Sequence, residues 1–127
     1  MNVTGVDFIA VPTQDYEQAE AFYGDVLGLE RSKQWGEMPA REFETGSLTL
    51  AVMQMDAFGQ QFGRHPAPIA LHVDDVAATR KELEEKGVKF HGDIIDSGVC
   101  HMAIFNDPDG NTLMLHNRYA PKDAKPG

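Results

Sequence analysis

The sequence contains a single cysteine, Cys100, among its 127 residues. One thiol excludes an internal disulfide and a cysteine-based zinc cluster, and it is typical of proteins from a reducing compartment. No apolar run approaches the roughly 18 residues that a membrane-spanning helix needs. The N-terminus also lacks the basic-then-apolar pattern of a secretion signal. We therefore expect a cytoplasmic protein with no membrane partner.

Basic residues are scarce, with 11 Lys and Arg against 20 Asp and Glu, which gives a formal net charge of −9. An acidic surface repels nucleic acid and anionic membranes. The same charge promotes solubility or favours a cationic small ligand. The sequence thus argues against a nucleic-acid partner and leaves a small molecule as the expected one.

The hydrophobic pattern predicts the same order of elements twice: a strand, a helix and three strands. In the first half we expect a helix between Asp15 and Gly28, and strands over 3–11, 29–35, 41–45 and 48–54. In the second half we expect a helix between Asp75 and Gly87, and strands over 69–73, 88–91, 99–105 and 112–116.

The two halves repeat at a nearly fixed offset. The expected helix starts, Asp15 and Asp75, stand 60 residues apart, and the helix stops, Gly28 and Gly87, stand 59 apart. Such self-similarity indicates a duplicated βαβββ unit. We expect one domain over 1–120 and a polar tail over 121–127. Within the domain, the modules span about 1–55 and 68–118, joined by a Gly- and Pro-rich connector over 56–67.

Several motifs in both halves resemble one family. They are Ala21-Phe22-Tyr23, Val26-Leu27-Gly28-Leu29, Leu71-His72-Val73-Asp74-Asp75-Val76, Glu85-Lys86-Gly87-Val88 and the turn Phe105-Asn106-Asp107-Pro108-Asp109-Gly110-Asn111. In these the chain is similar to the vicinal oxygen chelate superfamily, which includes glyoxalase I, bleomycin-resistance proteins and extradiol dioxygenases. The resemblance implies an α+β fold in which two βαβββ modules form a curved mixed sheet around a cleft, usually within a homodimer.

The same resemblance implies where a metal would be held, by one residue on each of four strands. Those positions are occupied here by Phe8, Ala51, Pro68 and Met114. None of these side chains has an oxygen or nitrogen with which to bind a divalent ion. We therefore predict no metal and no other cofactor. The alternative is one divalent metal ion at a displaced site.

His72 and His116 are the candidate catalytic residues. Strand alternation places both on the cleft side with Cys100 and Met102, and turns His101 toward a helix. Three interpretations stay open: a displaced pair of metal ligands, a general acid or base, or partly buried histidines hydrogen-bonded to the backbone or to Tyr119.

Without a metal, the cleft has an apolar, aromatic and thioether lining that suits a flat or apolar small molecule. The predicted ligand-binding residues are Phe8, Trp35, Ala51, Met53, Pro68, His72, Met102, Ile104, Met114 and His116. The other interpretation is a cleft filled by its own side chains. The sequence favours a small-molecule-binding protein similar to the bleomycin-resistance proteins. A metal-dependent lyase, isomerase or dioxygenase is the alternative, so enzymatic activity is left open.

Overall fold

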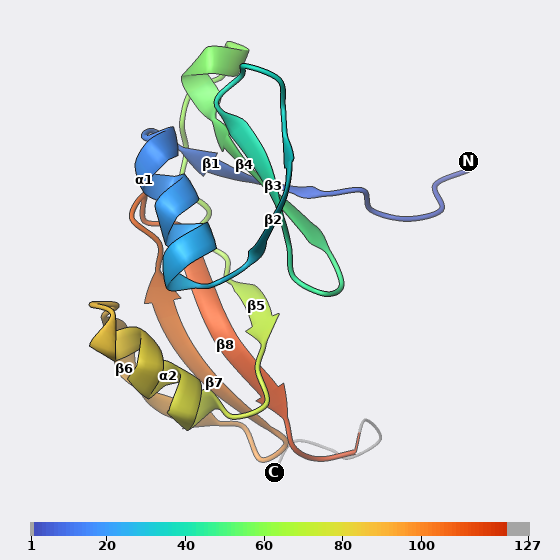
Figure 1. Cartoon of the computed structure of the whole chain (residues 1–127). Helices are drawn as coiled ribbons and strands as arrows, with labels where there is room; N and C mark the ends of the chain where they lie inside the picture. The colour runs from blue at the N-terminus through green and yellow to red at the C-terminus, as the bar shows by residue number, and fades with distance from the viewer. Residues whose placement is uncertain (1, 122–127) are drawn as a thin grey trace. The chain divides into compact units, whose positions relative to one another are not determined.

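The computed structural model describes residues 2–121, and the chain divides into two units, Met1–His65 and Pro66–Gly127. Each unit holds a four-stranded mixed sheet with a helix against one face (Figure 1). The element order is βαβββ in both units, so the predicted α+β fold is confirmed. Most of the predicted tail, from residue 122 onward, lies outside the described residues.

The sheet of the first unit has the strand order β1-β4-β3-β2, with β1 parallel to β4 and the other neighbours antiparallel. Its elements are β1 (Ile9–Thr13), α1 (Tyr16–Ala21), a π-helical turn η1 (Phe22–Val26), β2 (Glu30–Gln34), β3 (Ala40–Glu44), β4 (Thr49–Gln54) and a 3-10 turn η2 (Met55–Phe58).

Helix α1 and the π-helical turn η1 together fill the helix predicted between Asp15 and Gly28. The Asp15 side chain accepts a hydrogen bond from the Gln18 backbone N–H at 3.2 Å, as an N-cap does. The helix continues through η1 and stops at Gly28, which has φ +70°, a conformation that glycine adopts without strain. Tyr23 is fully buried and its ring lies 6.0 Å from the Phe43 ring, which anchors the helix to the sheet.

The first strand differs from the prediction over 3–11. It begins only at Ile9 and continues through Pro12 to Thr13, while residues 2–8 are exposed and form no strand. Proline is tolerated here because β1 lies at the edge of its sheet, where its missing N–H need not bond a neighbouring strand. Residues 2–8 are β-prone, but β-propensity alone does not create a strand without a pairing partner.

The sheet of the second unit has the strand order β5-β8-β7-β6, with β5 parallel to β8. Its elements are β5 (Ile69–His72), α2 (Val76–Glu85), β6 (Phe90–Asp96), β7 (Cys100–Asn106) and β8 (Thr112–Arg118). Strand β6 is longer than the predicted 88–91, because its pairing with β7 shifts register between His91 and Ile95 and so accommodates Gly92 and Asp93. Among the described residues, no helix has the length and apolar character needed to cross a membrane.

The turn between β7 and β8 forms as predicted. The Asp107 carboxylate accepts hydrogen bonds from the backbone N–H groups of Asp109 and Asn111, both at 2.9 Å. Asp107 and Asn111 are buried, and Gly110 has φ +89°. The turn therefore fixes the antiparallel register of β7 against β8, on which the arrangement of the second sheet depends.

One face of each sheet packs against the helix of its own unit. In the first unit Phe43 contacts Tyr23 of η1, the turn that continues α1, and in the second the Arg80 guanidinium of α2 lies 4.9 Å from the centre of the Phe90 ring. Cross-strand partners lie on the same face of a sheet, and neighbours along a strand alternate between faces. We call the opposite side of each sheet its helix-free face.

Candidate functional site

Three aromatic rings meet on the helix-free face of the first sheet. The Phe8 and Trp35 rings are edge-to-face, with centroids 5.4 Å apart, and the Trp35 and Phe58 rings are edge-to-face at 6.1 Å. The rings come from the residue before β1, the residue after β2 and the turn η2. We call this set the aromatic cluster.

A carboxylate fixes the central ring of the aromatic cluster. The Trp35 indole N–H donates a hydrogen bond to Glu42 Oε2 at 2.7 Å. Glu42 is the cross-strand partner of Ala51, which places it on the helix-free face. The indole therefore has one preferred orientation, and a negative charge lies beside its ring.

The remaining predicted residues of the first unit differ in exposure. Phe8 is 40% exposed, Trp35 and Met53 are half-buried, and Ala51 is fully buried. Ala51 can therefore support larger side chains above it, but it presents no surface to a ligand. Glu42 was missed by sequence reasoning, because only the register of β3 against β4 shows that it shares a face with Met53 and Ala51.

On the helix-free face of the second sheet, the register brings the two candidate histidines together. His72 on β5 and His116 on β8 are cross-strand partners, and His116 is also the partner of Met102 on β7. In the next row, Met114 lies between Ala70 and Ile104. The shared face predicted for His72, His116 and Met102 agrees with this register. The exposed Pro68 immediately precedes β5.

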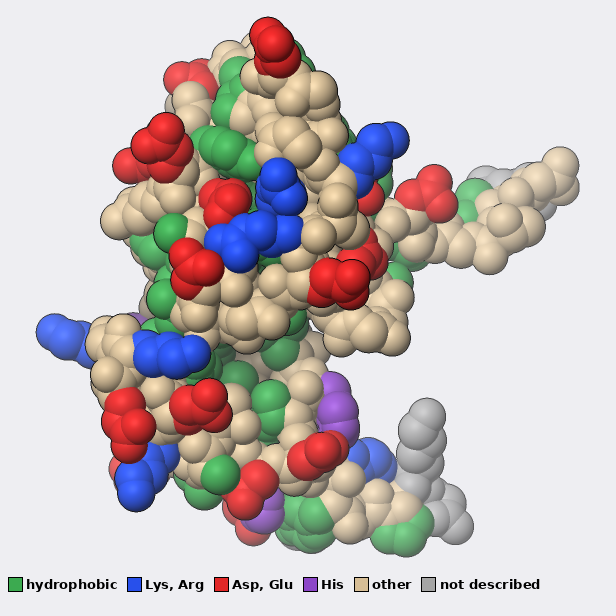
Figure 2. Space-filling model, in the orientation of Figure 1, with side chains coloured by type: hydrophobic (Ala, Val, Ile, Leu, Met, Phe, Trp, Pro, Cys, Tyr) green, Lys and Arg blue, Asp and Glu red, His purple; other side chains and the backbone are tan. Residues whose placement is uncertain are grey.

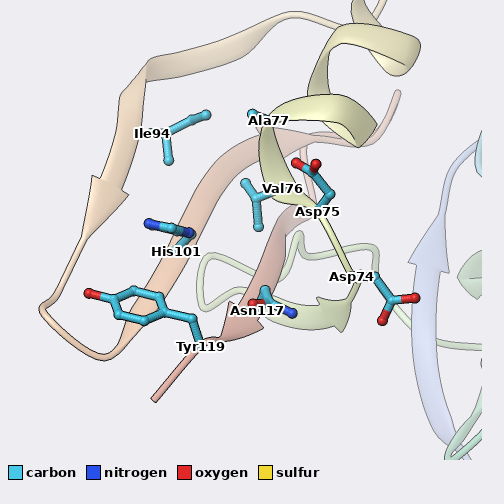
Figure 3. A pocket seen from close by; sticks show the side chains of 8 residues that line it. All are labelled: Asp74, Asp75, Val76, Ala77, Ile94, His101, Asn117 and Tyr119. Atoms are coloured by element: carbon cyan, nitrogen blue, oxygen red, sulfur yellow. The ribbon is translucent and has the colours of Figure 1, made fainter.

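Tyr119, one of the partners suggested for the two histidines, forms its hydrogen bond elsewhere. His72 is exposed, with Nε2 3.3 Å from Asp74 Oδ1, and His116 is half-buried. Tyr119 instead donates its hydroxyl hydrogen to Asp96 at 2.8 Å and packs its ring against His101. The suggested bond from a candidate histidine to Tyr119 is wrong, because Tyr119 lies on the helix side, where His101 also points, as predicted (Figure 3).

The residues present do not fit the metal centre implied by the family resemblance. Phe8, Ala51, Pro68 and Met114 supply hydrocarbon and thioether groups, which bind hard or borderline divalent ions poorly. Within residues 2–121, no group of three or more His, Cys, Asp or Glu side chains is arranged to hold a metal ion. No reaction step can therefore be derived through a metal from these residues.

Acidic and basic side chains are interspersed over the face seen in Figure 2. Arg31 Nη2 lies 2.6 Å from Glu20 Oε1 and 3.1 Å from Asp25 Oδ1. These hydrogen bonds raise the pKa of the guanidinium above its ordinary value. Hydrogen bonds from Ser32 and Thr49 lower the pKa of Glu44. Arg31 is thus paired with carboxylates of its own unit.

A family comparison agrees with this architecture. The model of the Glyoxalase/Bleomycin resistance protein/Dioxygenase superfamily matches residues 5–115. The chain belongs to this superfamily. The chain is 32% identical to the protein YaeR of Escherichia coli strain K12, across 89% of this chain and 95% of that protein. It is 26% identical to YraH of Bacillus subtilis strain 168, across 85% and 94%.

Solved structures of the superfamily share the fold. TnmS3, an antibiotic binding protein from Streptomyces sp. CB03234, matches with a TM-score of 0.76 and 25% identity, across 93% of this chain and 98% of that one. A lactoylglutathione lyase from Agrobacterium tumefaciens also gives a TM-score of 0.76, at 19% identity, across 91% and 94%. The superfamily fold therefore occurs in both a binding protein and an enzyme, and the side chains of the site must decide between them.

Proposed function

We propose that this superfamily member is a homodimeric, cytoplasmic binding protein that takes up a small, flat, largely apolar molecule without a metal ion. The observation that carries the proposal is the replacement of the four expected metal ligands by Phe8, Ala51, Pro68 and Met114. One of these replacements, Phe8, belongs to the aromatic cluster. A position that would bind a metal thus contributes an aromatic ring instead.

The aromatic cluster supports a flat ligand. Edge-to-face contacts and the bond to Glu42 hold the Trp35 ring in place, so little side-chain entropy is lost when a planar molecule stacks on it. The Glu42 carboxylate beside the ring favours a ligand that carries positive charge. The formal net charge of −9 also favours a positively charged ligand.

The likeness to TnmS3 supports binding as the function, because that protein is described as an antibiotic binding protein. The exposed apolar side chains Val3 and Val6, which are 76% and 61% exposed, support a second copy of the chain as a partner. The single cysteine, which is buried and free, supports a reducing compartment.

Binding can be tested with proflavine, a planar aromatic cation, and anthracene-9-carboxylate, a planar anion. We expect proflavine to raise the melting temperature in a concentration-dependent way, because a ligand that binds only the folded state stabilises it. Trp35→Ala should abolish the rise. Leu48→Ala, which truncates an exposed apolar residue in the β3–β4 turn, is the matched control and should not.

The proposal fails if neither compound changes the melting temperature, or if Trp35→Ala responds like the unmodified protein. A larger response to the anion would retain the flat ligand but contradict the role of Glu42.

A second candidate function rests on the pairing of His72 with His116. Two neighbouring imidazoles could bind a divalent metal at a displaced site, completed by the partner copy, and so support lyase, isomerase or dioxygenase chemistry. Either imidazole could also act as a metal-free general acid or base. The metal version predicts stoichiometric Ni, Zn, Mn or Fe that is lost in the double substitution His72→Ala and His116→Ala.

A further inference from the structure

The second unit has a cavity on the helix side of its sheet, on the opposite face from His72 and His116. Its volume is about 430 Å³, within the range of small-molecule sites. Figure 3 shows the surrounding side chains. They are Asp74, Asp75, Val76, Ala77, Ile94, His101, Asn117 and Tyr119.

One wall of this cavity is aromatic and held in place. The His101 and Tyr119 rings lie 4.7 Å apart at an angle of 37°. The Tyr119 hydroxyl donates to Asp96 Oδ1 at 2.8 Å, and His101 Nε2 lies 3.4 Å from Asp96 Oδ2. Asp96, which is not part of the lining, therefore holds both rings in place. Ile94, Val76 and Ala77 supply the apolar part of the lining.

The polar groups of the cavity present hydrogen-bond acceptors. Asn117 Nδ2 donates to the Val73 carbonyl at 2.9 Å, so the amide oxygen lies on the side of His101 and Tyr119, as Figure 3 shows. In a neutral imidazole whose Nε2 carries the proton, Nδ1 is an acceptor. Proximity of Nε2 to the Asp96 carboxylate favours that tautomer.

Two acceptors beside an aromatic wall match the chemistry of an ammonium group, which is a donor only and is attracted to the face of a ring. The carboxylates of Asp74 and Asp75 at the start of α2 add negative charge to the rim. The backbone N–H groups of the first turn would favour an anion, but the Asp75 side chain already accepts from the Ala78 N–H at 2.9 Å. We propose that this cavity is a second binding site, which takes a small primary amine with an apolar body.

The probe for this site is benzylammonium chloride, titrated into the full-length protein and followed by two-dimensional NMR. Saturable shifts are expected at His101, Tyr119 and Asn117, and the Trp35 indole signal reports separately on any binding of the probe to the aromatic cluster of the first unit. Sodium benzoate has the same size and the opposite charge. It should bind about tenfold more weakly or worse, the effect of losing one charged hydrogen bond.

Two matched pairs of variants locate the site. Ile94→Trp fills the cavity and should abolish binding, whereas Ile95→Trp, one residue along β6 and facing the opposite side, should not. His101→Phe keeps the ring beside Tyr119 but removes the acceptor, so affinity should fall about tenfold. His91→Phe, an exposed histidine outside the cavity, is its control.

Equal binding of benzoate would overturn the amine assignment, and equal binding by Ile94→Trp and Ile95→Trp would overturn the location. Absence of saturable shifts would overturn the site itself. If Ile94→Trp does not fold, as judged by circular dichroism, the His101→Phe and His91→Phe pair decides the test alone.

Discussion

At the scale of single residues, the hydrogen bond between Asp96 and Tyr119 shifts the pKa of both groups. Hydrogen bonds from the Gly98 backbone N–H and then from Tyr119 lower the pKa of Asp96, and the bond to Asp96 raises the pKa of Tyr119. The stabilisation from Asp96 is present above the ordinary carboxyl pKa and is lost as pH falls through its lowered value. The stabilisation from Tyr119 is present below the ordinary phenol pKa and is lost as pH rises through its raised value.

Tyr119→Phe should move the pKa of Asp96 upward, toward the ordinary carboxyl value, because one of its hydrogen-bond donors is removed. The value should stay below the ordinary one, since the Gly98 N–H still donates at 2.8 Å. A carboxyl-detected NMR titration measures this directly. Tyr16→Phe removes a phenol that bonds Gln34 in the first unit and should leave Asp96 unchanged. An unmoved Asp96 in Tyr119→Phe would show that the bond to Tyr119 is not formed in solution.

At the scale of elements, the N-cap of α2 should contribute measurably to stability. Asp75→Ala leaves the Ala78 N–H without its side-chain acceptor and should lower the free energy of unfolding by about 1 kcal/mol. Asp75→Ser should recover most of the loss, because a hydroxyl also accepts at an N-cap. Urea unfolding measures both. Lys81→Ala, on an exposed position of the same helix, is the control. A loss in Asp75→Ser as large as in Asp75→Ala would contradict the capping role.

Elements whose signals are local could be predicted from the sequence. The caps at Asp15 and Asp75, the stop at Gly28 and the turn at Asp107 each depend on residues a few positions apart. The ends of β1 and β6 could not be predicted, because pairing with β4 and with β7 decides them. Long-range pairing overrides local propensity in strands more readily than in helices.

The candidate site also has features that local sequence predicts and features that depend on long-range pairing. Alternation along a strand was enough to place His72, His116 and Met102 on one face and His101 on the other. The contact of Trp35 with Glu42, and of Tyr119 with Asp96, required the register of particular strands and the path of the chain after β8. The cavity beside α2 is lined by residues from four separate segments of the second unit, so no local sequence pattern predicts it.

At the scale of the whole molecule, we expect a homodimer with twice the chain mass in light scattering at micromolar concentration. The exposed Val3 and Val6 would provide apolar surface for a partner copy. The double substitution Val3→Lys and Val6→Lys should shift the equilibrium toward monomer, because charged side chains oppose burial at an interface. Lys33→Ala and Lys89→Ala, which change exposed side chains on β2 and before β6, serve as controls. A monomer for the unmodified protein would refute the dimer.

The central claim is that the protein binds no metal ion, because hydrocarbon and thioether side chains stand where the family resemblance implies the metal ligands. Native mass spectrometry of freshly purified, untagged protein, before and after incubation with Ni, Zn, Mn and Fe salts, tests it most directly. We expect the mass of the polypeptide alone or with a small organic ligand, and no ion retained after buffer exchange. One divalent ion per chain, retained in stoichiometric amount and lost on substitution of His72 and His116, would contradict the claim.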